Sequence, residues 1–271
     1  MELNSVFERL WKDYADQNPS VNKIYKLLSD EGEDIDNDHI AFRTLNYPSI
    51  NIEVVARPFT TEGYLPCGEY VFMDKHLFAR HYELPGNEKA PRVFISQLLL
   101  EECSPFIRST FDDLLKKCDP AVFSSGELIY SGSLSADISY EVYMKMRQES
   151  EYAAWFYVFG FRANHFTVSI NSLKKYNTIS QVNELIKRSG FILNSSGGEI
   201  KGTPADLLQQ SSIMADVVSV KFIEGVYEIP SCYYEFAQRF PDSDGRLYGG
   251  FSAKSADKIF ESTNFYRKEQ G

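Results

Sequence analysis

The sequence contains few of the residues and patterns that mark several common classes of protein. Its 271 residues include only four cysteines, and no two of them form a C-x-x-C pair, so neither a zinc ribbon nor a thioredoxin-like centre is expected. No G-x-S-x-G, P-loop or G-x-G-x-x-G pattern is present, which removes the usual signatures of hydrolases and nucleotide-binding proteins. The composition, 43% apolar and 24% charged, is otherwise that of a globular protein.

Positive charge and long apolar runs are also scarce. A formal net charge of -10 argues against a phosphate backbone as a partner, so nucleic acid is not expected. The longest apolar run, around residues 153–161, is too short to span a bilayer, and the first residues lack the apolar core of a signal peptide. We therefore expect a cytoplasmic protein without a membrane partner. The sequence leaves the oligomeric state open, and a homodimer is one arrangement that it allows.

Two parts of the chain show the same order of predicted elements. His39 begins an alternating strand, which is followed by a helical stretch at 50–56 and by Gly63, 24 positions after the histidine. His165 begins a second such strand, followed by a helix at 179–188 and by Gly190, 25 positions on. Strand-like runs then occur at 69–84 and 92–98 in the first part, and at 216–222 and 232–240 in the second. Each part is typical of a βαβββ module, although two ordinary strand–helix units in chance register are an alternative.

These patterns predict a single α+β domain over residues 1–271, in which the two βαβββ modules form one curved mixed sheet with added helices. Within it we expect N-terminal helices in 1–35, a first module in 36–103, a helical insertion in 104–155, and a second module with a C-terminal extension in 156–271. The individual helices are predicted at 3–14, 21–28, 105–117 and 140–151.

Only four histidines are available for a metal site. His76 and His81 are five residues apart, which places them on opposite faces of a strand, so we expect separate, partly exposed or polar-lining roles for them. His39 and His165 occupy equivalent positions at the start of the first strand of each module, and a shared curved sheet would bring them together. Taken singly, each would more often be a core or turn residue, so the pairing alone points to a metal.

The residues that precede these two histidines are small and polar. Asn37 and Asp38 precede His39, and Asn164 precedes His165, so these residues could form hydrogen bonds that fix the tautomer of each ring. Turn formation at the start of a strand explains the same residues equally well.

Glu235 lies in an aromatic and otherwise apolar strand. Burying an unpaired carboxylate costs several kcal/mol, so a metal or a basic group should face it. The alternative is that Glu235 lies on the solvent-facing side and pairs with Arg239. The matching strand of the first module, 93–97, has no carboxylate, so one metal is expected and not two.

Two imidazoles and one carboxylate leave three positions open on an octahedral metal, an arrangement that suits Fe(II) and O2 activation, whereas zinc usually prefers four ligands. A 2-oxo acid can fill two of these positions and O2 the third. Arg43 lies four residues after His39, so it shares that face of the strand about 13 Å away at ~3.3 Å per residue. Its guanidinium could bind a second carboxylate, which would select a dicarboxylic acid, or could form a structural ion pair.

Six segments spread almost end to end along the chain resemble the motifs of one enzyme family. They are 38–43, 70–76, 93–96, 164–167, 234–237 and 256–263. Together they resemble the short members of the 2-oxoadipate dioxygenase/decarboxylase family, which is built on the vicinal oxygen chelate fold.

The resemblance implies that His39, His165 and Glu235 bind Fe(II) and that Arg43 is the catalytic residue that contacts the substrate. Ser252, in a segment similar to one that lines the family's substrate pocket, is a further expected contact. The implied partners are O2 and a 2-oxo acid. The implied reaction converts 2-oxoadipate and O2 to 2-hydroxyglutarate and CO2, by oxidative decarboxylation and an intramolecular hydroxylation like that of hydroxymandelate synthase.

Two other functions fit the same fold. A glyoxalase-like lyase or isomerase would bind zinc, nickel or manganese in place of iron. A metal-free small-molecule binding protein would keep the cleft without turnover, and it predicts that His39 and Glu235 lie apart.

Overall fold

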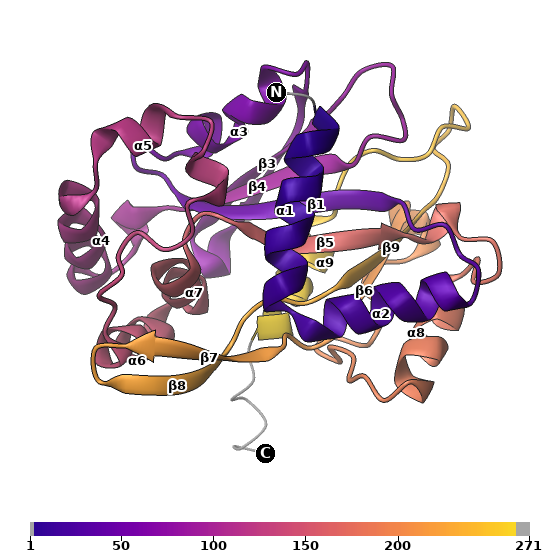
Figure 1. Ribbon diagram of the computed structural model, residues 1–271. Helices are drawn as coiled ribbons and strands as arrows, with labels where there is room; N and C mark the ends of the chain where they lie inside the picture. Colours follow the sequence, from indigo (N-terminus) through magenta and orange to yellow (C-terminus); the bar gives the residue numbers. More distant parts are fainter. Residues whose placement is uncertain (1–2, 264–271) are drawn as a thin grey trace.

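The computed structural model describes residues 3–263, so positions 1–2 and 264–271 of the expected single domain lie outside the described residues (Figure 1). The chain begins with two helices, α1 (Leu3–Gln17) and α2 (Pro19–Asp30), which confirms the expected helical pair. Pro19 occupies the first turn of α2, where its missing N–H costs nothing. Figure 1 shows α1 lying across the sheet, and its buried residues, among them Leu10 and Tyr14, pack on that side.

The first half of the chain follows the expected order of strand, helix and strands. The single run expected at 69–84 is divided in two, because the turn Met73–Lys75 and the left-handed residue His76 (φ +55°) separate its strands. Asn51 begins the helix of this half by accepting a hydrogen bond from the Val54 N–H. The elements are β1 (Asn37–Leu45), α3 (Ile52–Thr60), β2 (Leu65–Phe72), β3 (Leu77–Glu83) and β4 (Arg92–Leu98).

The second half departs from the expected pattern in one place. The strand expected at 216–222 forms, but it pairs with its neighbour in a separate two-stranded sheet, and a short polar strand that the sequence did not reveal takes its place in the main sheet. That strand reads LQQSS, so its apolar alternation is too weak to predict. The elements are β5 (Ala163–Ser169), α8 (Ile179–Arg188), β6 (Leu208–Ser212), β7 (Val217–Phe222), β8 (Gly225–Pro230) and β9 (Glu235–Arg239).

One mixed seven-stranded sheet joins the two halves, in the order β2-β3-β4-β1-β5-β9-β6. At its centre β1 is antiparallel to β5, with Ala41 opposite His165 and His39 opposite Thr167. On the outer side of this pair, β4 runs parallel to β1 and β9 runs parallel to β5. The first strands of the two halves therefore lie side by side, as the expected α+β fold requires.

The insertion between the halves is helical. The helix expected at 105–117 is α4 (Pro105–Lys117), whereas the one expected at 140–151 is divided into two, because Ser150 leaves the helical conformation and caps the second. Tyr152 to Phe159 are all buried, which accounts for the longest apolar run of the sequence. The remaining helices are α5 (Pro120–Ser124), α6 (Tyr140–Glu149), α7 (Glu151–Phe159) and α9 (Ala253–Ile259), with short 3-10 turns at Leu100–Glu102, Leu128–Tyr130, Ile170–Ser172, Pro204–Asp206 and Phe260–Thr263.

The structure also describes the helices with respect to membranes and the state of the cysteines. Among residues 3–263, no helix combines the length and the apolar character needed to cross a membrane. All four cysteines are free, with Cys103 and Cys232 buried and Cys67 exposed.

Gly160 ends α7 and sets the path into β5, so its substitution should destabilise the protein. Its φ of +58° is unfavourable for an L-residue, and a Cβ would overlap the carbonyl of Gly132, which is hydrogen-bonded to the Phe161 N–H at 2.8 Å. We expect Gly160→Ala to lower the free energy of unfolding by about 3 kcal/mol in urea denaturation. The control Gly190→Ala, also at positive φ but with open space around the Cβ, should cost about 1 kcal/mol; equal losses would contradict the explanation.

Candidate metal centre and substrate cavity

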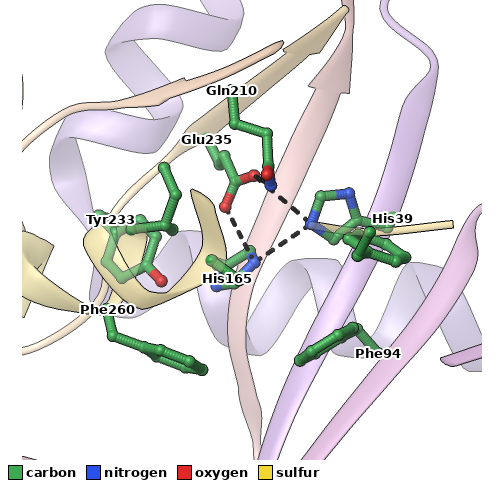
Figure 2. A pocket seen from close by; sticks show the side chains of 10 residues that line it. His39, Phe94, His165, Gln210, Tyr233, Glu235 and Phe260 are labelled. Carbon is green, nitrogen blue, oxygen red and sulfur yellow. Dashed lines mark hydrogen bonds and ion pairs between the residues drawn. The ribbon is translucent and has the colours of Figure 1, made fainter. Parts of the chain in front are cut away.

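Three side chains from neighbouring central strands converge in the interior, His39 from β1, His165 from β5 and Glu235 from β9 (Figure 2). The two Nε2 atoms are 3.4 Å apart. Glu235 places one carboxylate oxygen 3.6 Å from His39 Nε2 and the other 3.2 Å from His165 Nε2. The convergence follows from strand pairing, since β1 lies beside β5 and β5 beside β9.

The chemistry of this cluster fits a metal cation. Glu235 is fully buried, and although Gln210 donates to its Oε1 at 2.6 Å, its Oε2 has no hydrogen-bond partner. Burial raises the pKa of Glu235 to about 8 and lowers the pKa of both histidines, so the cluster lacks the charge that would stabilise an ionised carboxylate. A cation bound here would supply it.

The alternative in which Glu235 faces solvent and pairs with Arg239 is wrong. Arg239 instead donates from Nε to Asp38 Oδ2 at 2.6 Å and from a terminal nitrogen to Oδ1 at 2.9 Å. Although burial acts in the opposite direction, Arg239 and His39 hold the pKa of Asp38 well below its usual range, so this carboxylate stays ionised.

The small polar residues before each histidine orient the rings. Asp38 Oδ1 lies 2.7 Å from His39 Nδ1, and Asn164 Oδ1 lies 3.2 Å from His165 Nδ1. Because a carboxylate and an amide oxygen can only accept, each Nδ1 carries the proton and each Nε2 is left with a lone pair. The Thr167 hydroxyl lies 3.1 Å from His39 Nε2 and can donate to it. The expected contact of each ring with the polar residue that precedes it is thus confirmed.

A small cavity of about 20 Å³ adjoins the three candidate ligands, with room for about one water molecule. Phe251 covers one side, with its ring centroid 4.8 Å from that of His39. Arg239 holds the segment before Phe251 in place by donating hydrogen bonds to the carbonyls of Tyr248 and Gly250. The lining also comprises Phe94, Gln210, Tyr233, Ala256, Ile259 and Phe260, so the cover over the polar cluster is aromatic and apolar.

Arg43 is buried beside this site, with only 1% of its surface exposed. Its guanidinium carbon lies 4.9 Å from the ring centroids of both Tyr152 and Trp155. One terminal nitrogen is 3.4 Å from Glu151 Oε1, but Nε and the other terminal nitrogen have no hydrogen-bond partner. A structural ion pair therefore satisfies only part of the guanidinium.

Ser252 lies next to Phe251, but its own hydroxyl caps α9 by accepting from the Ser255 N–H at 3.4 Å. It is not among the residues that line the cavity. Its contact with substrate stays a prediction.

The other two histidines lie apart from the cluster. His76 is exposed and pairs with Glu102 at 2.7 Å. Of the two roles expected for His81, partial exposure is wrong, because the residue is 2% exposed between β2 and β4 and beside the Phe251 ring. Its ring nitrogens are hydrogen-bonded to the Tyr70 hydroxyl at 2.9 Å and to Glu83 at 3.0 Å. Cys67, His81 and Glu83 lie close enough to share a metal, but these hydrogen bonds already satisfy the imidazole.

Sequence reasoning missed two polar residues of the site, Gln210 and Tyr233. Gln210 lies on the unrecognised strand β6, where nothing in the sequence distinguishes it. Tyr233 precedes Glu235 by two residues, a spacing that places both side chains on one face of an extended chain. This spacing could have indicated that Tyr233 lies beside Glu235 in the site.

Comparison with known proteins identifies the family. The family model for 2-oxoadipate dioxygenase/decarboxylase matches residues 6–124 and 126–247. The chain belongs to this family. A rice (Oryza sativa) relative, a chloroplastic/amyloplastic 2-oxoadipate dioxygenase/decarboxylase, is 35% identical over 97% of this chain and 79% of its own length.

Solved structures agree with this assignment. The hydroxyglutarate synthase of Oryza sativa, solved in complex with 2-oxoadipate, has a TM-score of 0.88 and 32% identity over 98% of this chain and 93% of that one. A protein of Shewanella frigidimarina with a provisional hydrolase description has a TM-score of 0.87 and 48% identity, covering 93% and 98% of the two chains. A Ralstonia eutropha protein provisionally placed in the glyoxalase superfamily has a TM-score of 0.73 and 18% identity, over 90% and 83%. The expected glyoxalase-like, vicinal oxygen chelate fold and the 2-oxoadipate dioxygenase/decarboxylase activity of the family are confirmed.

Asp38 holds the His39 ring and pairs with the buried Arg239. Asp38→Asn removes the charge that pairs with buried Arg239, so we expect the free energy of unfolding to fall by about 3 to 5 kcal/mol in denaturant titrations. The matched control is Asp34→Asn, because Asp34 forms an ion pair with Lys174 in which its side chain is 79% exposed. That change should cost less than about 0.5 kcal/mol, and a similar small loss for Asp38→Asn would contradict the assigned role.

Proposed function

We propose that this family member uses His39, His165 and Glu235 to bind one Fe(II), and that it acts on 2-oxoadipate or a closely similar 2-oxo dicarboxylic acid. The observation that carries the proposal is the buried Glu235 carboxylate, whose Oε2 has no hydrogen-bond partner and lies 3.2 Å from His165 Nε2, while its Oε1 lies 3.6 Å from His39 Nε2. Burying an ionised carboxylate away from water, beside two imidazole lone pairs, has a high free-energy cost unless a cation is bound.

Iron is the metal that this ligand set favours for the family's reaction. Three protein ligands on one side leave positions free, so bound Fe(II) would supply a chelating site for the oxo acid and a site of O2 activation. The protein's own contribution is to hold the two Nδ1 protons through Asp38 and Asn164. The aromatic cover separates the reacting groups from bulk solvent.

Arg43 would select the dicarboxylic substrate. The rice structure was solved with 2-oxoadipate, whose second carboxylate needs a counter-charge. The guanidinium of Arg43 is buried and retains two nitrogens without partners, so a carboxylate placed there would gain a charge-assisted hydrogen bond. Ser252, beside Phe251, is proposed as a second contact on the basis of family resemblance.

The proposed reaction balances with 2-oxoadipate and O2 alone. The C1–C2 bond breaks and C1 leaves as CO2. One oxygen atom completes a new carboxylate at C2, and the other is inserted into a C3–H bond as a hydroxyl, which gives 2-hydroxyglutarate.

Three other expectations from the sequence stay predictions. They are the cytoplasmic location, a homodimeric assembly, and the division of the chain into N-terminal helices, two modules and a helical insertion.

The metal and the reaction can be tested together. Protein loaded anaerobically with Fe(II) and 2-oxoadipate should show the visible charge-transfer band of a chelated oxo acid, and admitted air should give O2 uptake with CO2 and 2-hydroxyglutarate as products. We expect His165→Ala to abolish both the band and the uptake, whereas the control His76→Ala, a change at an exposed histidine, leaves them unchanged. No band and no uptake in the unmodified protein would instead favour a glyoxalase-like or a binding function.

Arg43→Ala tests the selection of the distal carboxylate. We expect 2-oxoadipate to bind more weakly by about 2 to 5 kcal/mol in an anaerobic titration of the band, because its second carboxylate would be buried without a partner. Arg80→Ala is the control, since Arg80 pairs with Glu53 and Glu69 away from the cavity. Unchanged binding by a folded Arg43→Ala protein, verified by its melting temperature, would exclude this role.

A further inference from the structure

Tyr233 carries a buried hydroxyl that the proposed reaction does not yet use. The residue is fully buried and lines the cavity, and its hydroxyl has no hydrogen-bond partner. Leaving such a group unpaired in the interior costs about 1 to 3 kcal/mol, and where the residue also lines a cavity, as Tyr233 does, a ligand can supply the missing partner.

The ring of Tyr233 is held in position. It stacks on the His165 imidazole, with centroids 4.9 Å apart and planes at 27°. Figure 2 shows the hydroxyl directed toward the space between His165 and Phe260. The hydroxyl is therefore presented to the cavity beside a candidate metal ligand.

Both hydrogen-bond acceptors and hydrogen-bond donors without partners lie around this site. Glu235 offers an acceptor oxygen without a partner at the metal cluster. Arg43 and Tyr233 offer donors without partners. Both lie near Phe260, because Phe260 lines the cavity together with Tyr233 and its ring centroid is 5.8 Å from the Arg43 guanidinium carbon. A 2-oxo dicarboxylic acid bound at the metal by its oxo-acid end would bring its second carboxylate to these donors.

We propose that the Tyr233 hydroxyl donates a hydrogen bond to the distal carboxylate of the bound 2-oxo dicarboxylic acid, next to Arg43. The inference rests on the proposed function and adds a second substrate contact to it. Tyr233 therefore helps to distinguish dicarboxylic from monocarboxylic oxo acids, because a monocarboxylic acid leaves the hydroxyl unpaired.

The adjacent residue provides a matched control. Tyr234 is also fully buried and its hydroxyl also lacks a partner, but its ring packs against Trp11 and Tyr14 of α1. Tyr234 is absent from the residues that line the cavity. Tyr234→Phe therefore makes the same chemical change one residue away, without touching the site.

The experiment compares Tyr233→Phe, Tyr234→Phe and unmodified protein, each loaded anaerobically with Fe(II). Binding of 2-oxoadipate and of 2-oxohexanoate, which carries a methyl group in place of the distal carboxylate, is measured by calorimetry; iron content and melting temperature are measured alongside. We expect Tyr233→Phe to weaken 2-oxoadipate about 10- to 100-fold, as for a hydrogen bond to a charged group, and to change 2-oxohexanoate less than about twofold. Tyr234→Phe should change neither.

A second measurement uses the Arg43→Ala background. Since both donors contact the same carboxylate, the effects of Tyr233→Phe and Arg43→Ala on 2-oxoadipate binding should not be additive. Unchanged 2-oxoadipate binding by iron-loaded Tyr233→Phe, or equal weakening of both acids, would overturn the proposal while leaving the proposed function intact. Failure of the unmodified protein to bind 2-oxoadipate would overturn both.

Discussion

The antiparallel pairing of β1 with β5 is the contact on which the site depends. These two strands begin the two halves of the chain, and their register sets His39 opposite Thr167 and Ala41 opposite His165. Because side chains alternate between the faces of a strand, a slip of one residue would turn one histidine away from the other. The parallel pairing of β9 with β5 then adds Glu235 at the level of Thr167.

Unpaired polar atoms are concentrated around this junction. Glu235, Gln210, Tyr233 and Arg43 each have at least one buried side-chain atom without a hydrogen-bond partner, although native interiors usually satisfy such atoms. One step further out, Asp38 is well paired, since both His39 and Arg239 hold it, whereas the side-chain nitrogen of Asn164 has no hydrogen-bond partner. The unpaired atoms at the centre of the site are therefore the ones that the proposed cation and anionic substrate would contact.

The cover of the cavity belongs to the C-terminal part of the described chain. Phe251 packs on His39, while Phe260 and Ile259 close the other side, so the polar cluster is separated from solvent by apolar side chains. Arg239 links this cover to the three candidate metal ligands, because its guanidinium bonds both Asp38, which holds His39, and the backbone before Phe251. A low-dielectric surrounding strengthens the attraction between a bound cation and Glu235.

The sequence by itself determined the repeated strand and helix order, the candidate ligands His39 and His165, and the cost of burying Glu235, because periodicity and residue chemistry are local properties. The six segments that resemble the family's motifs, taken together, also indicated its chemistry. Only the tertiary structure decided that β6 replaces β7 in the sheet, that Arg239 bonds Asp38 and not Glu235, and that Tyr233 and Gln210 line the cavity. These depend on strand pairing between residues far apart in the chain, which no local pattern specifies.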